Sequence, residues 1–244
     1  MIYNKTAFIT GSNGDIGKSI ITKLIKKKFK VICQIRKKDN EFKKFLSLFK
    51  KSSIEIVNFD LTDEKKMTKE ISKLYKKNIS IDLLVNCAGT ASGSLFEMTK
   101  IEEIKRVFNV NFFSQLKIIQ ALLRLLKKSQ RPSIINIGSI MGIIPERGTI
   151  AYGSSKASLM FSTKIMANEF SNYNIRVNSV APSITKTKML DKMDKNVIKR
   201  IKEENYKKKI CNPSDVAELV YFLSTKNSEH INGQVIRIDG GMKI

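Results

Sequence analysis

Two kinds of segment alternate along the chain. In short segments nearly every residue is apolar, which is typical of strands buried on both faces of a sheet. In longer segments apolar residues recur every three or four positions, as on one face of a helix. The predicted strands are residues 6–10, 31–35, 54–59, 81–85 and 134–137, and the predicted helices are one that ends at 28, 41–50, 101–128 and one that begins at 152.

This alternation predicts an α/β fold with a parallel sheet. No Pro-rich, Gly/Ser-rich or highly charged linker divides the 244 residues, so we expect a single domain over residues 1–244. Right-handed crossovers from a central first strand predict a doubly wound, seven-stranded sheet in the order 3-2-1-4-5-6-7, with helices on both faces. The switch point of such a sheet, where ligands bind, then lies beside Gly11.

A serine, a tyrosine and a lysine occur together between residues 134 and 156. Ser139 follows a predicted strand, and Tyr152 and Lys156 are four residues apart on one face of a predicted helix. A phenol has a reference pKa of about 10, which a nearby ammonium lowers. Tyr152 can then act as general acid or base on an oxygen to which Ser139 also bonds. A Tyr-Lys pair at this spacing is usually only a solvated pair on a helix surface. The neighbouring motifs therefore decide whether this pair is catalytic.

A glycine-rich turn joins the first predicted strand to its helix, with glycines at 11, 14 and 17. Glycines at this place let backbone N–H groups approach a pyrophosphate at the positive end of the helix. Many glycine triplets are only loops. Directly between a first strand and an amphipathic helix, however, the turn predicts a dinucleotide site.

The second predicted strand ends at Ile35, where an acidic residue commonly contacts the adenosine ribose. Here Arg36, Lys37 and Lys38 follow instead. A cationic strand end suits a 2′-phosphate, so NADP(H) is favoured over NAD(H). The alternative is that these residues only reflect the abundance of lysine.

Small and polar residues follow other predicted strands. Asp60 can accept from an adenine amine, and Thr62 or Asp63 can cap the next helix. The small residues at 86–89 would let a cofactor lie against the backbone. Asn111 lies within a predicted helix, where asparagine is usually tolerated but can bend the helix and hold a water.

The net charge is +23, from 45 Lys and Arg against 22 Asp and Glu. Such a charge is compatible with nucleic-acid or membrane binding. However, the lysines are spread over nearly every predicted helix, and no nucleic-acid-binding motif accompanies them. The codon usage of an AT-rich genome explains the composition better, so we expect neither nucleic acid nor membrane as a partner.

The cysteines Cys33, Cys87 and Cys211 are odd in number and widely spaced. They indicate neither a disulfide framework nor a metal site, and a reducing compartment is expected. The chain enters a predicted strand almost at once, and no apolar run approaches the length of about 18 residues that a membrane helix needs. We therefore expect a cytoplasmic protein.

Seven motifs occur in one order along the chain. They are TGSNGDIG at 10–17, NCAG at 86–89, Asn111, NIGS at 136–139, YGSSK at 152–156, IRVNSVAPSITKT at 175–187 and INGQVIRIDGG at 231–241. Over essentially its whole length the chain closely resembles the short-chain dehydrogenase/reductases. The resemblance implies a Rossmann-type fold and an NAD(P)-dependent oxidoreductase that interconverts ketones and secondary alcohols.

The resemblance also implies roles for individual residues. Asn111, Ser139, Tyr152 and Lys156 would form a catalytic tetrad, in which a water held by Asn111 relays protons through Lys156 and the ribose to Tyr152. No metal ligand is implied. The implied cofactor contacts are Gly11, Ser12, Asn13, Asp15, Ile16, Arg36, Asp60, Leu61, Asn86, Ala88, Gly89, Tyr152, Lys156, Pro182, Thr185 and Thr187.

Three positions depart from the family pattern. Asp15 stands where the classical members have glycine, and its carboxylate would repel a pyrophosphate unless it points away. Cys87 replaces an asparagine, and Ser183 replaces a glycine before the carboxamide contacts. These departures concern the fine positioning of a cofactor.

Within the family the chain is most similar to bacterial 3-oxoacyl-acyl-carrier-protein reductases, although enzymes acting on sugars, nucleotide sugars or other small ketones look alike. The segment 186–209, expected to form a helical flap over the substrate, holds ten Lys and Arg against four Asp and Glu. That excess suits an anionic substrate or an acidic carrier, with lysine abundance as the alternative. A catalytically silent NADP(H)-sensing regulator is a further alternative, which the intact Ser139, Tyr152 and Lys156 disfavour.

Two predicted helices carry more apolar residues than one sheet face can cover. We therefore expect a homodimer or homotetramer built on these helices, as the family resemblance also implies. The residues are Leu116, Ile119, Leu122, Leu123, Leu159, Met160, Thr163 and Met166.

Overall fold

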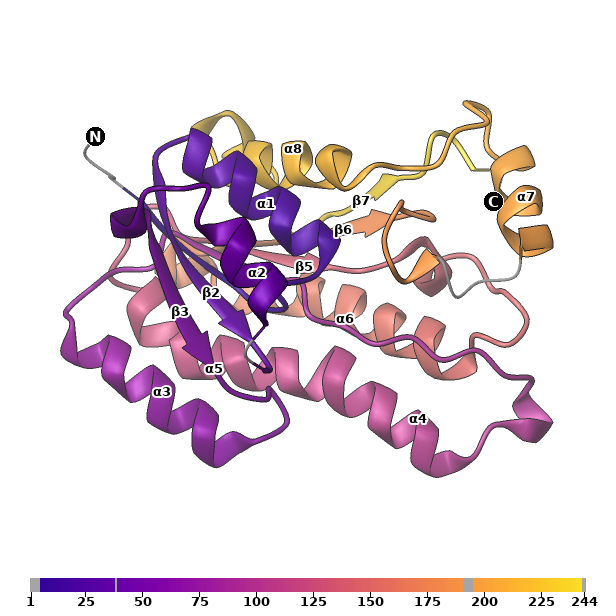
Figure 1. Cartoon of the computed structure of the whole chain (residues 1–244), viewed down its shortest axis with the longest axis horizontal. Helices are drawn as coiled ribbons and strands as arrows, with labels where there is room; N and C mark the ends of the chain where they lie inside the picture. Colours follow the sequence, from indigo (N-terminus) through magenta and orange to yellow (C-terminus); the bar gives the residue numbers. More distant parts are fainter. Residues whose placement is uncertain (1–4, 38, 191–194, 243–244) are drawn as a thin grey trace.

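A computed structural model of the chain describes residues 5–37, 39–190 and 195–242 (Figure 1). All seven strands are parallel and lie in one sheet in the order β3-β2-β1-β4-β5-β6-β7, which confirms the predicted doubly wound fold. The strands are β1 (Lys5–Ile9), β2 (Phe29–Ile35), β3 (Ile54–Asn58), β4 (Leu83–Asn86), β5 (Ser133–Ile137), β6 (Arg176–Pro182) and β7 (Val235–Ile238).

Helices cover both faces of this sheet (Figure 1). Helices α1, α2 and α8 pack on one face, and α3, α5 and α6 on the other. They are α1 (Asp15–Lys26), α2 (Asn40–Leu46), α3 (Glu64–Lys76), α4 (Ile101–Phe108), α5 (Ser114–Leu126), α6 (Ile150–Glu169), α7 (Lys195–Glu203) and α8 (Pro213–Leu223).

The strands are apolar throughout because both of their faces are buried. In β1, Ala7 and Ile9 belong to the core beneath α1 and α8, whereas Phe8 belongs to the core beneath α3 and α5. This alternation follows from the two-residue repeat of a strand. Every residue of β4 and β5 is buried, so the only part of these strands open to a ligand is the carboxyl edge where they end.

Strand β1 lies between β2 and β4. The first half of the chain builds the sheet from β1 toward β3, and the second half builds it in the opposite direction, from β4 toward β7. The loops after β1 and β4 therefore diverge around a common crevice at the carboxyl edge, which is where open α/β sheets bind ligands. The Gly11 turn lies directly after β1, as predicted.

Two predicted helices differ from the structure. The helix expected over 41–50 spans Asn40–Leu46, and the apolar Leu48 beyond it is 77% exposed and does not join the core. The helix expected over 101–128 is two α-helices separated by a π-helical segment, Asn109–Phe113. Sequence periodicity does not reveal the extra residue of a π-turn, because apolar residues on both sides keep helical spacing. Within the described part of the chain, no helix combines the length and apolarity that a membrane span requires.

Candidate active site

The turn after β1 lies against the loop after β4. Gly11 has a positive φ of 62°, and a Cβ there would come within 2.7 Å of the Ala88 Cα. A Cβ on Gly17 would come within 2.6 Å of the Gly11 carbonyl oxygen. Both glycines are therefore required by close backbone approach, and they hold the start of α1 beside the ends of β1 and β4.

Helix α1 begins at this turn without a side-chain cap. Its N-cap residue is Gly14, and the first intrahelical hydrogen bond runs from the Lys18 N–H to the Gly14 carbonyl. The N–H groups of the first turn of a helix have no intrahelical acceptor, and the helix dipole makes this end positive. An uncapped helix end at the carboxyl edge of the sheet fits a diphosphate group.

Two buried side chains that the sequence analysis did not single out fix this turn. The Gln34 side chain accepts from the Gly11 N–H at 3.0 Å and donates to the Phe59 carbonyl at 2.6 Å. The Thr10 hydroxyl accepts from the N–H groups of Cys87 and Ala88 at 2.9 and 3.0 Å. A polar residue inside an apolar strand such as β2 was the available sequence signal for Gln34.

Asn86 lies at the end of β4 and is buried. Its amide donates to the Asn136 side chain at 2.8 Å, and Asn136 in turn donates to the Thr163 hydroxyl at 2.9 Å. This chain of bonds joins β4, β5 and α6 in the core. The Asn86 Oδ1 atom has no hydrogen-bond partner in the described structure, so an acceptor stands unsatisfied beside the loop expected to contact a cofactor.

The predicted catalytic Asn111 lies in the π-helical segment and is fully buried. Its amide nitrogen donates to the Thr90 carbonyl at 2.9 Å and to the Ser155 hydroxyl at 3.0 Å, and its Oδ1 accepts from the Thr90 N–H at 2.8 Å. Asn111 thus ties the loop after β4 to α6. Because both amide hydrogens are used, the predicted water would have to be held chiefly by backbone groups, and it stays a prediction.

Ser139, Tyr152 and Lys156 come together at the ends of β5 and α6. Ser139 is buried, its Oγ accepts from the Met141 N–H at 3.2 Å, and its hydroxyl is close enough to Tyr152 to act on the pKa of that phenol. The Lys156 ammonium donates to the Ile137 carbonyl at 2.7 Å and lies 5.9 Å from the centre of the Tyr152 ring. A Cβ on Gly89 would lie 3.4 Å from both the Lys156 ammonium and the Asn111 Oδ1, so Asn111 and Lys156 both reach the loop after β4.

The electrostatics of this triad differ from the expectation. Burial raises the pKa of Tyr152, and the hydrogen bond to Ser139 opposes the shift without cancelling it. The predicted lowering of this pKa by Lys156 is therefore wrong for the protein without cofactor, because desolvation of the phenolate is the larger effect. Burial also lowers the pKa of Lys156 to about 8. At neutral pH Tyr152 holds its proton and Lys156 is mostly cationic, which suits delivery of a proton to an oxygen.

The predicted adenosine contacts lie at the ends of β2 and β3. Arg36 is exposed after β2, and Lys38 lies outside the described residues. The Asp60 Oδ1 accepts from the N–H and hydroxyl of Thr62 at 2.9 and 2.7 Å, while Asp63, one of the two proposed caps, caps α3. Leu61 is buried.

A carboxylate that the sequence analysis did not consider also lies near this end of the crevice. Asp39 caps α2 by accepting from the Phe42 N–H at 2.9 Å, and its other oxygen accepts from the Asn13 amide at 3.0 Å. The hydrogen bond from Asn13 holds the pKa of Asp39 below its usual range. Asp39 therefore links the start of α2 to the glycine-rich turn as an anion.

The predicted carboxamide contacts follow β6. Pro182 ends the strand, the Thr185 hydroxyl donates to the Ser183 carbonyl at 2.9 Å, and the Thr187 hydroxyl donates to the Thr185 carbonyl at 3.3 Å. This segment is also paired with the chain just ahead of α8, since the Lys186 N–H donates to the Cys211 carbonyl at 3.0 Å. The segment is thus held near the carboxyl edge by its own backbone.

A cleft of about 340 Å³ lies beside α6. Its apolar lining includes Phe96, Ile143, Ile144 and Ile150. Three polar side chains also line it, those of Glu146, Thr149 and Ser154. Of the predicted flap, 191–194 lie outside the described residues, and the described part contains α7. Helix α7 packs on the loop after β5 through a buried contact of Ile140, Ile201 and Met242, and Arg200 pairs with Glu146 at 2.6 Å.

Comparison with known proteins agrees with this geometry. Residues 5–198 match the family model for the short chain dehydrogenase. The chain is a short-chain dehydrogenase. This short-chain dehydrogenase is 32% identical to the "3-oxoacyl-[acyl-carrier-protein] reductase FabG" of Buchnera aphidicola subsp. Acyrthosiphon pisum, over 99% of this chain and 98% of that one. It is 29% identical to the "Acetoacetyl-CoA reductase" of Acinetobacter sp., over 99% of each chain.

Among solved structures, this short-chain dehydrogenase is similar to "ElxO with NADP Bound", with a TM-score of 0.87, 32% identity, and coverage of 97% of this chain and 98% of that one. The family establishes an NAD(P)-dependent oxidoreductase, as the motifs predicted. Among the described residues, no group of three or more His, Cys, Asp or Glu is placed to hold a metal ion.

Proposed function

We propose that this short-chain dehydrogenase uses NADPH to reduce a 3-oxoacyl thioester to the 3-hydroxyacyl thioester, within one catalytic domain of 244 residues. The observation that carries the proposal is the meeting of Ser139, Tyr152 and a buried Lys156 ammonium at the end of β5. Relatives named for 3-oxoacyl and acetoacetyl thioesters support the substrate class.

The bound nicotinamide would supply the hydride to the ketone carbon. Ser139 would donate a hydrogen bond to the ketone oxygen and so stabilise the negative charge that develops there. Tyr152, whose raised pKa keeps it protonated, would deliver its proton to the same oxygen. Lys156 would place its positive charge beside the phenolate that remains and favour its formation.

The residues around the crevice support binding of NADPH. The uncapped start of α1 would hold the diphosphate, and Arg36 would hold the 2′-phosphate. The backbone of the loop after β4, at Ala88 and Gly89, would lie along the cofactor. Thr185 and Thr187 would hold the carboxamide.

The cleft beside α6 supports an acyl substrate, because several large apolar side chains of its lining are exposed. Phe96 is 73% exposed, Ile150 is 40% exposed and Ile143 is 38% exposed. A sugar would need more hydrogen-bonding side chains than the three that line this cleft, Glu146, Thr149 and Ser154. The test is a hydride-transfer assay with NADPH and a panel of 3-oxoacyl thioesters and keto-sugars. Reduction of the thioesters supports the proposal. Reduction of keto-sugars alone would replace the proposed substrate class by sugars. Binding of NADPH without any turnover would favour the regulator.

NADPH should bind at least about tenfold more tightly than NADH, which corresponds to about 1.4 kcal/mol, because Arg36 can pair with the 2′-phosphate. Replacement of Arg36 by alanine should remove most of this difference while leaving the affinity for NADH unchanged. Fluorescence titration of both cofactors into both proteins measures the effect.

Lys37→Ala is the matched control, since it removes the same charge from the neighbouring exposed residue. We expect it to lower the preference by no more than about twofold, because a diffuse charge is screened by salt. Equal affinities of the parent protein for the two cofactors would show instead that the anionic Asp39 dominates this end of the crevice.

An apolar face supports assembly into a homodimer or homotetramer. The prediction of which helical residues form this contact is mostly wrong, because six of the eight are buried inside the chain itself. The six are Ile119, Leu122, Leu159, Met160, Thr163 and Met166. The exposed apolar residues of the same region are Phe113 at 50%, Phe161 at 65% and Ile165 at 47%.

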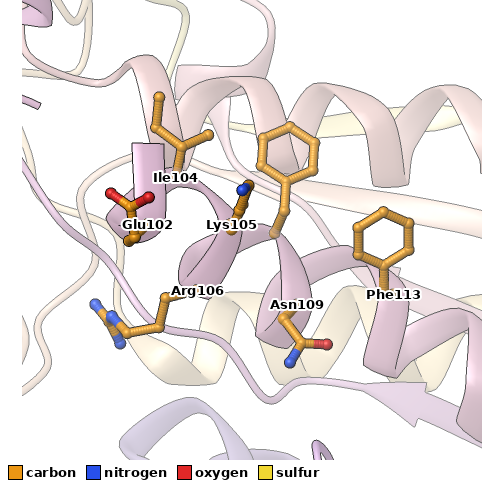
Figure 2. A pocket seen from close by; sticks show the side chains of 7 residues that line it. Glu102, Ile104, Lys105, Arg106, Asn109 and Phe113 are labelled. Atoms are coloured by element: carbon orange, nitrogen blue, oxygen red, sulfur yellow. The ribbon is translucent and has the colours of Figure 1, made fainter. Parts of the chain in front are cut away.

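Next to Phe113 lies an open pocket of about 580 Å³ on the surface of α4 and the π-helical segment (Figure 2). Its lining side chains lie along one helical stretch, and none of them belongs to the catalytic tetrad. A second copy of the chain would cover this hollow and the exposed phenylalanines.

Phe161→Glu should therefore raise the dissociation constant of the assembly by at least about tenfold, because it places a charge in a buried contact. Sedimentation velocity over a concentration series measures this constant. Leu48→Glu, at an apolar residue that is 77% exposed elsewhere, is the control and should change nothing. A parent protein that is monomeric at micromolar concentration would contradict the proposed assembly.

A further inference from the structure

Asp15 is the first residue of α1, and its carboxylate makes a contact far along the chain. Its Oδ2 accepts from the backbone N–H of Lys188 at 2.7 Å, although 173 positions separate the two residues. The carboxylate is thereby committed to the segment after β6. An acid at position 15 is expected to be tolerated only if it points away from a diphosphate. The Lys188 N–H holds the carboxylate in its own direction and so meets this condition.

The position of Lys188 requires its segment to cross the crevice. Strand β6 lies three places from β1 in the sheet, beyond β4 and β5, and neighbouring strands are about 4.8 Å apart, so the ends of β6 and β1 are separated by about 14 Å. The residues from Pro182 to Lys188 can span about 20 Å when extended. They connect the end of β6 to the start of α1, past the carboxyl ends of the intervening strands.

The rest of this crossing segment is fixed at its other end. The Ser183 N–H donates to the Ile238 carbonyl at 2.9 Å, and Lys186 pairs with Cys211. The Lys188 side chain reaches Glu41 at 2.9 Å, but both side chains are more than 70% exposed, so this ion pair adds little. The hydrogen bond to Asp15 is therefore the contact that holds the α1 end of the segment.

We propose that Asp15 is a positioning residue for the cofactor, which latches the segment 183–188 to the start of α1 across a bound dinucleotide. The inference rests on the proposed use of NADPH. A cofactor extended along the carboxyl edge lies beneath the crossing segment and leaves when the bond between Asp15 and Lys188 opens. The classical glycine has no side chain with which to make this bond, so the departure at position 15 gives this chain a tighter hold on its cofactor.

The test compares Asp15→Ala, which removes the acceptor, with Asp15→Asn, which keeps a neutral one. In the protein without cofactor, the amide hydrogen of Lys188 should exchange with deuterium at least about tenfold faster in Asp15→Ala than in the parent. Asp15→Asn should restore part of the protection. Glu41→Ala, which removes only the side-chain partner of Lys188, should leave the exchange within about twofold of the parent value.

The same proteins then test the hold on the cofactor. In Asp15→Ala, NADPH should dissociate at least about tenfold faster in stopped-flow displacement and its KM should rise, with partial recovery in Asp15→Asn. Hydride transfer in a single turnover at saturating NADPH should stay within about twofold, because Asp15 does not touch the reacting atoms. A variant that merely unfolded would lose this step as well.

Unchanged exchange at Lys188 in Asp15→Ala would overturn the latch. Faster exchange with an unchanged rate of NADPH dissociation would show that the segment does not cover the cofactor, which also overturns it. A parent protein that binds neither dinucleotide would refute the proposed function, and the exchange comparison, made without cofactor, would still decide whether Asp15 holds the segment.

Discussion

Tyr152→Phe should lower kcat by about 10² to 10⁴-fold, the range for removal of a general acid. The proton that Tyr152 would donate to the ketone oxygen is missing, while the ring still packs beside Lys156. The dissociation constant of NADPH should therefore stay within about twofold of the parent value. Steady-state kinetics with a 3-oxoacyl thioester and a cofactor titration measure the two quantities.

Tyr173→Phe is the matched control, because Tyr173 is 46% exposed and contacts Lys127 rather than the site. It should retain the parent kcat. Near-normal turnover in Tyr152→Phe would mean that the Ser139 hydroxyl or a water supplies the proton, and that the tyrosine is structural.

Lys156→Met should abolish measurable turnover and weaken NADPH binding. The ammonium would both stabilise the phenolate left on Tyr152 and bond to the nicotinamide ribose, and methionine offers neither charge nor donor. Kinetics and titration measure these losses. Lys164→Met, on the exposed face of the same helix, is the control. It should keep both the turnover and the NADPH affinity of the parent protein.

The same substitution should also reveal a stability cost of the buried ammonium. Burial lowers the pKa of Lys156 from 10.5 to about 8 in the folded protein. Between these two values the unfolded chain holds the proton and the folded protein does not, so this group makes the free energy of unfolding rise with pH. A shift of this size corresponds to about 3 kcal/mol, and the charged group destabilises the fold at neutral pH by up to that amount.

Denaturant unfolding of parent and Lys156→Met at pH 7 and pH 10 tests this sign. The difference between the two proteins cancels the titration of all other groups, and the parent should gain about 1 to 3 kcal/mol relative to the variant as pH rises. A constant difference would show that Lys156 is not desolvated. Lys156→Met also lacks the hydrogen bond from Lys156 to the Ile137 carbonyl. This loss is the same at both pH values, so it does not produce a pH-dependent difference between the two proteins.

The fold was predictable from sequence because it follows from local signals. Fully apolar strands alternating with amphipathic helices leave few arrangements once crossovers are right-handed. The proximity of the residues proposed to be catalytic was predictable for a similar reason. Ser139 follows a strand, and Tyr152 and Lys156 are one helical turn apart, so local structure alone brings them near the carboxyl edge.

The supporting contacts were not predictable, because each joins residues far apart in the chain. Gln34 holds Gly11, and Asn111 holds Thr90 and Ser155, and no local pattern identifies such partners. The tyrosine pKa was misjudged for a related reason. Its direction depends on how far the phenol is desolvated, which is a property of the packed site and not of the spacing between Tyr152 and Lys156.

The surface available for assembly was also misjudged from sequence. Leu122 and Leu159 are apolar and lie at helical spacing from other apolar residues, yet each is buried inside the chain. Phe161 lies two positions after Leu159 and points to solvent. Periodicity shows that a helix has an apolar face, but the packing of the sheet decides which residues remain exposed.

The most direct measurement follows the hydride itself. NADPH carrying deuterium at the transferred position of nicotinamide C4 is incubated with the parent protein and a 3-oxoacyl thioester, and the product is examined by mass spectrometry and NMR. We predict one deuterium on the new carbinol carbon of the 3-hydroxyacyl thioester, and at least about a hundredfold less of this product with Tyr152→Phe over the same time. Product without deuterium, or no product from any thioester or keto-sugar although NADPH binds, would contradict hydride transfer at the Ser139, Tyr152 and Lys156 site.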